Sequence, residues 1–96
     1  MFLGSPFNIA SYAAFTYIIC QYLGEDYRPD KLVMNIGDAH IYEEHIKQSF
    51  EQIGREPHPF PQLKIRPFQK IEDLTFEDFE LINYTHEKAI TAQMKA

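Results

Sequence analysis

Residues 5–24, SPFNIASYAAFTYIICQYLG, are the most informative stretch of this chain. They predict a helix from about Phe7 to Leu23. Ser5 can cap its start and Pro6 suits the first helical position, while Gly24 can adopt the left-handed conformation that ends a helix. Apolar side chains point in every direction around the axis, which is typical of a helix buried in a large core. The rest of the 96 residues are too few and too polar to surround it, so the sequence indicates part of a larger fold.

The pattern after this helix predicts an α+β class in a single domain, residues 1–96. We expect one long buried helix against strands of a mixed sheet, incomplete as an independent domain. β-forming residues predict strands, an apolar stripe predicts a surface helix, and a capping-box pair predicts a short helix. The expected elements are a strand at Leu32–Tyr42, a surface helix at Glu43–Ile53, an extended Pro-rich stretch at 57–61, a short strand at Leu63–Ile65, a short helix from Thr75 and a last strand at Glu80–Tyr84.

Composition excludes several classes of partner. The net charge is −5 and no block of Lys and Arg occurs, so we expect no nucleic-acid binding. The single cysteine, Cys20, can form no internal disulfide, which favours a reducing, cytoplasmic location. The start of the chain has no signal-peptide pattern, and the apolar stretch at 9–20 is too short to span a bilayer. We therefore expect a soluble protein without membrane contact.

Two places could bind a ligand. On the expected strand, Asp38, His40 and Tyr42 would share one side, because strand side chains alternate between faces. A carboxylate, an imidazole and a phenol in a row suit a hydroxylated ligand such as a sugar, but the pattern alone is more typical of a solvent-facing strand without a ligand. Asn8, in the first turn of the helix, could recognise a ligand edge with its amide or make only a local capping bond.

Other reactive side chains give no catalytic pattern. His40, Glu44 and His45 lie across a strand–helix junction and lack the His-Glu-x-x-His spacing, so we expect no metal site. Cys20 lies among apolar residues without a cationic neighbour that would favour a thiolate, which predicts an inert core thiol. His58 has no partner identifiable from the sequence.

Three stretches, in order and at the right spacing, resemble one family. They are MFLGSPFNIASYA (residues 1–13), GDAHIY (37–42) and REPHPFPQLKI (55–65). Together they are similar to thymidylate synthases across nearly the whole chain. Three ordered motifs argue against the alternative, a small acidic interaction domain whose resemblance to this family is accidental.

The resemblance implies roles for individual residues. Asn8 matches the asparagine that hydrogen-bonds the uracil ring of dUMP, and His40 and Tyr42 match the pair that binds the deoxyribose 3′-hydroxyl. The remaining matched positions line the folate and pyrimidine cleft or belong to the tail that folds over the folate: Leu3, Gly4, Phe7 and Ala96. The family reductively methylates dUMP to dTMP with 5,10-methylenetetrahydrofolate as co-substrate, as a homodimer.

The resemblance also implies what this stretch lacks. The family's cysteine nucleophile and its phosphate-binding arginine precede the matched region, and Cys20 does not fall at the nucleophile's position. We therefore expect a C-terminal portion of the enzyme, inactive alone and partnered by the missing N-terminal portion; the alternative is a truncated, non-catalytic product. Two departures occur in the tail, where HEK at 86–88 replaces the family's usual Pro-His-Pro and the chain ends Lys95-Ala96.

Overall fold

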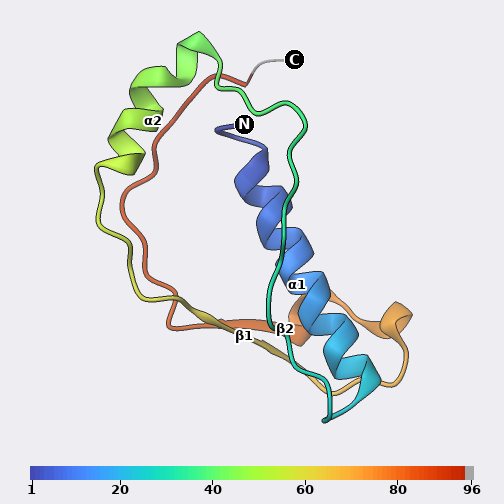
Figure 1. Cartoon of the computed structure of the whole chain (residues 1–96). Helices are drawn as coiled ribbons and strands as arrows, with labels where there is room; N and C mark the ends of the chain where they lie inside the picture. Colours follow the sequence, from blue (N-terminus) through green and yellow to red (C-terminus); the bar gives the residue numbers. More distant parts are fainter. Residues whose placement is uncertain (95–96) are drawn as a thin grey trace.

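The computed structural model describes residues 1–94 and has an α+β architecture. Two α-helices and one small antiparallel sheet are joined by long irregular segments (Figure 1). In chain order the elements are α1 (Ser5–Leu23), the 3-10 turn η1 (Glu43–His45), α2 (Ile46–Ile53), β1 (Gln62–Ile65), the 3-10 turns η2 (Ile71–Asp73) and η3 (Phe76–Asp78), and β2 (Phe79–Ile82).

Helix α1 confirms the predicted helix but begins differently at its N-terminus. The helix starts at Ser5 itself, Gly4 is the capping position, and no side chain caps it. The backbone N–H of Asn8 donates to the carbonyl of Gly4 at 3.1 Å, so backbone bonding closes this turn. Ser5 is therefore not the cap that the sequence predicted. At the other end Gly24 has φ 117°, a conformation that favours glycine, as expected.

The predicted strand at Leu32–Tyr42 is wrong. The structure has no strand between Gly24 and Tyr42, because no other extended segment of the described residues pairs with this stretch. High β-propensity describes side chains that suit a pleated, half-buried surface, and it does not supply a partner strand. The backbone is nevertheless extended at Tyr42, with φ −63° and ψ 145°.

The later elements agree better with the sequence. The expected helix at Glu43–Ile53 forms as η1 followed by α2, and Gly54 ends it. The short helix from Thr75 forms as η3 with the expected capping box, in which the Thr75 N–H donates to the Asp78 carboxylate at 2.8 Å. The two short strands pair antiparallel with Leu63 opposite Leu81, so the described residues form a two-stranded antiparallel sheet and not a mixed one.

Helix α1 is largely exposed within residues 1–94, as the sequence indicated for an apolar helix that the rest of the chain is too small to surround. Phe7, Tyr12 and Phe15 are 77%, 59% and 51% exposed, and Ile65 in β1 is the one buried apolar side chain within residues 1–94. The accessible surface is 8716 Å², whereas a folded monomer of this length exposes about 5,700 Å². The radius of gyration of 16.2 Å likewise exceeds the value of about 12 Å for a compact chain. The apolar pattern of α1 is real, but the residues that would cover it are not among those described.

The segment after β2 positions the candidate site. It runs back past the Pro-rich stretch toward α2 and the start of α1 (Figure 1). A hydrogen bond joins the backbone of this segment to the chain before β1: the Arg55 guanidinium donates to the carbonyl oxygen of Lys88 at 2.8 Å. We call residues 83–94 the C-terminal segment. Among the helices of residues 1–94, none has the length and apolarity needed to cross a membrane.

Candidate functional site

Aromatic and imidazole rings gather where the extended stretch meets η1. The rings of His40 and Tyr42 lie 5.3 Å apart, centroid to centroid, and meet edge to face at 81°. His40 Nδ1 lies 3.5 Å from a carboxylate oxygen of Asp38, and both side chains are largely exposed. The three side chains that the sequence predicted to share one side therefore do lie together, although the strand that motivated the prediction does not form.

A buried histidine, His45, packs against this pair through Tyr42. The ring of His45 meets that of Tyr42 edge to face at 86°, with 5.8 Å between centroids, and its backbone N–H donates to the carbonyl of Tyr42 at 2.9 Å. The ring of Phe2, near the start of the chain, also packs against His45, with 5.8 Å between ring centroids. His45 is only 2% exposed. The start of the chain and the extended stretch therefore both pack against the imidazole of His45.

The other predicted site residues lie around the first turn of α1. Leu3 and Phe7 line one cavity of about 230 Å³, and Arg55 and Ile90 from two distant segments complete its wall. Asn8 is exposed, and no hydrogen bond or ring contact within residues 1–94 joins it to His40 or Tyr42.

Gly4 has open space around it. A Cβ at this position would meet nothing within 4 Å, and its φ of −88° is one that any residue adopts. Nothing in the described structure therefore requires glycine here. Ala96, the last predicted folate contact, lies outside the described residues.

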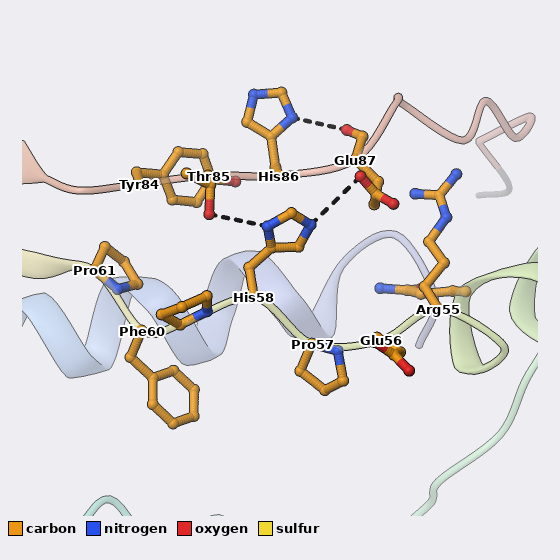
Figure 2. Close-up of a pocket in the computed structure, with 12 residues that line it drawn as sticks. Arg55, Glu56, Pro57, His58, Phe60, Pro61, Tyr84, Thr85, His86 and Glu87 are labelled. Carbon is orange, nitrogen blue, oxygen red and sulfur yellow. Dashed lines mark hydrogen bonds and ion pairs between the residues drawn. The ribbon is translucent and has the colours of Figure 1, made fainter.

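A second cavity, of about 360 Å³, lies between the Pro-rich stretch and the C-terminal segment (Figure 2). His58 Nδ1 lies 2.9 Å from the hydroxyl oxygen of Thr85, and its Nε2 lies 3.4 Å from a carboxylate oxygen of Glu87. The rings of Tyr84 and His86 are 5.2 Å apart on the same segment. Sequence reasoning found no partner for His58 because its partners are more than 25 residues away.

Metal-binding side chains are not clustered. No three His, Cys, Asp or Glu side chains within residues 1–94 lie close enough to hold one ion.

Comparison with known proteins identifies the family. The thymidylate synthase family model matches residues 1–96. The chain is 45% identical over 94 residues to the thymidylate synthase of Corynebacterium aurimucosum, an alignment that covers 98% of this chain and 34% of that protein. It is 39% identical over 94 residues to the thymidylate synthase of Mycoplasma pneumoniae, with coverages of 98% and 32%. This chain belongs to the thymidylate synthase family.

A third relative has two activities in its name. The bifunctional dihydrofolate reductase-thymidylate synthase of Plasmodium chabaudi is 43% identical over 95 residues, which cover 98% of this chain and 16% of that protein. The chain thus spans about a third of the length of the two thymidylate synthases and less of the bifunctional protein.

Proposed function

We propose that these residues form part of the substrate site of a thymidylate synthase, which reductively methylates dUMP to dTMP with 5,10-methylenetetrahydrofolate. The observation that carries the proposal is the family match over residues 1–96 together with the adjacent rings of His40 and Tyr42 in the GDAHIY stretch. A phenol and an imidazole side by side offer donors and acceptors to one sugar hydroxyl, which is the deoxyribose 3′-hydroxyl in this proposal.

The first turn of α1 supplies the remaining contacts in this proposal. The exposed amide of Asn8 presents a donor and an acceptor together, which matches the O4 and N3–H edge of uracil. Leu3 and Phe7 present apolar side chains to a cavity that also contains Arg55, a lining suited to the flat rings and polar edges of a folate. The open space at Gly4 is consistent with close approach of a ligand to the backbone, and Ala96 belongs to the tail that closes over the folate.

The chemical step needs a nucleophile that this stretch does not offer. A thiolate must attack C6 of dUMP before C5 can react with the folate. The single cysteine of these residues, Cys20, lies near the C-terminal end of α1 and does not match the nucleophile's position. We propose that the thiolate, the arginine clamp on the phosphate and the dimer partner come from the remainder of a synthase fold.

A chimeric synthase tests the function directly. In it, residues 1–96 replace the matched third of the Corynebacterium aurimucosum enzyme. We expect this chimeric synthase to bind dUMP and form dTMP, whereas the isolated 96 residues form none. A folded chimeric synthase that fails to bind dUMP contradicts the proposed site, and dTMP formation by the isolated chain contradicts the assignment of the nucleophile elsewhere. The intact Corynebacterium enzyme is the matched control for folding and assay.

A further inference from the structure

His45 is the most buried polar side chain of the described residues, and the proposed reaction does not use it. It is 2% exposed and lies at the junction of three segments of the chain. Its ring contacts Phe2 from the start of the chain and Tyr42 from the extended stretch. Its Nε2 lies 2.6 Å from the backbone carbonyl oxygen of Gln93, 48 residues further on.

The contact with Gln93 defines the state of the imidazole. A carbonyl oxygen can only accept, so Nε2 of His45 must carry the hydrogen and donate it. In the neutral ring Nδ1 is then an acceptor, and this atom is buried without a hydrogen-bond partner. The contact therefore requires a hydrogen on Nε2.

Packing alone does not explain a histidine at this place. A phenylalanine would fill a similar volume and make the same ring contacts with Phe2 and Tyr42, without a buried polar atom that lacks a partner. The one interaction that the imidazole adds is the hydrogen bond from Nε2 to Gln93. That bond ties residue 93 to the residue that packs directly against Tyr42.

We infer that His45 is a positioning residue whose Nε2–H holds the C-terminal segment against the stretch that carries His40 and Tyr42. This inference rests on the proposed function for its meaning, because those two residues contact the nucleotide there and the end of the chain closes over the folate. His45 touches neither ligand. It fixes the backbone of residue 93 beside the ring that packs against Tyr42, at the wall of the proposed nucleotide site.

Two substitutions separate the hydrogen bond from the packing. His45→Gln places an amide N–H near the position of Nε2 and can still donate to the Gln93 carbonyl. His45→Phe keeps the ring volume and loses the donor. His58→Phe is the matched control, since His58 contacts the C-terminal segment at Thr85 and Glu87, well before residue 93.

The first measurement is amide hydrogen exchange at residues 91–94, in the 96-residue chain and in the chimeric synthase. We expect exchange in His45→Phe to be about fivefold to tenfold faster, the range that loss of one net hydrogen bond gives. His45→Gln and His58→Phe should stay near the parent rate. Equal exchange in all four proteins overturns the inference.

The second measurement is steady-state kinetics of the chimeric synthase. For His45→Phe we expect the KM for methylenetetrahydrofolate to rise by about fivefold to tenfold, the Kd for dUMP to change by less than about twofold, and His45→Gln to restore the folate KM. If both variants lose dUMP binding to the same extent, His45 is merely structural and the inference fails. If the unsubstituted chimeric synthase does not bind dUMP, the proposed function fails, and the exchange measurement still tests the link between His45 and Gln93.

Discussion

Helix α1 and His45 differ in burial in the opposite way to their polarity: the apolar helix is exposed, and the polar histidine is buried. The helix is the most apolar element of the chain, and no side chain in it is fully buried. His45 carries a polar ring and is 2% exposed. Figure 1 shows that both ends of the described chain approach the region of η1 and α2, whereas α1 has single extended segments beside it and no second helix packed along it.

The difference separates two sources of burial. His45 is buried by segments within residues 1–94, which bring Phe2 and Gln93 to it. Helix α1 has few such neighbours: Gln21 donates to the backbone carbonyls of Ile65 and Arg66, both at 3.2 Å. Its apolar surface therefore marks where covering residues of a complete synthase fold belong in our proposal.

The largest expected effect concerns this helix. Phe15→Ala should lower the free energy of unfolding of the chimeric synthase by about 3–5 kcal/mol, because there the ring would be buried. In the isolated 96 residues, where the ring is 51% exposed, the same change should cost less than about 1 kcal/mol. Urea unfolding of the chimeric synthase and helix content of the isolated chain by circular dichroism measure the two effects. Phe76→Ala is the control, since that ring is 89% exposed at the start of η3. A Phe15→Ala chimeric synthase as stable as its parent would show that α1 stays uncovered.

The sequence predicted local features of the molecule and missed the distant ones. Pro6 and Gly24 located α1, an apolar stripe located α2, and a Thr–Asp pair located η3, because each signal lies within a few residues of its effect. The strand at Leu32–Tyr42 failed because a strand depends on a partner that propensity cannot specify.

The candidate site divides in the same way. His40 and Tyr42 could be expected to lie side by side, since alternate side chains of an extended backbone share a side even without a ladder. The burial of His45 could not be predicted, because its partner Gln93 is 48 residues away and no local sequence pattern indicates the contact. The family roles of Asn8 and Leu3 came from resemblance and stay predictions.

A smaller effect tests the exposed side of the His45 region. Tyr42→Phe removes one hydroxyl and leaves the ring contacts with His40 and His45 in place. In the chimeric synthase we expect the Kd for dUMP to rise about fivefold, since one net hydrogen bond is worth about 1 kcal/mol. Isothermal titration calorimetry with dUMP measures the change.

A 3′-deoxy analogue of dUMP makes the Tyr42 test specific. If Tyr42 bonds the 3′-hydroxyl, the parent chimeric synthase prefers dUMP to the analogue and Tyr42→Phe loses most of that preference, because the two changes remove the same interaction. An undiminished preference in the variant would place the 3′-hydroxyl elsewhere.

The smallest expected effect on the fold is that of Gly4→Ala. This substitution tests whether glycine is needed at position 4 for the stability of the fold or for close approach of a folate. The added methyl group meets nothing within 4 Å and φ is −88°, so the free energy of unfolding of the chimeric synthase should change by less than about 0.5 kcal/mol. If a folate passes close to this backbone, the same methyl group raises the KM for methylenetetrahydrofolate by about threefold to fivefold, since a small steric displacement at a ligand costs about 1 kcal/mol. Urea unfolding and steady-state kinetics are measured on one preparation, with the unsubstituted chimeric synthase as the control. If neither the folate KM nor the free energy of unfolding changes, Gly4 does not line the folate cleft. If the free energy of unfolding falls, covering residues of the synthase fold, and not the ligand, occupy the open space beside Gly4.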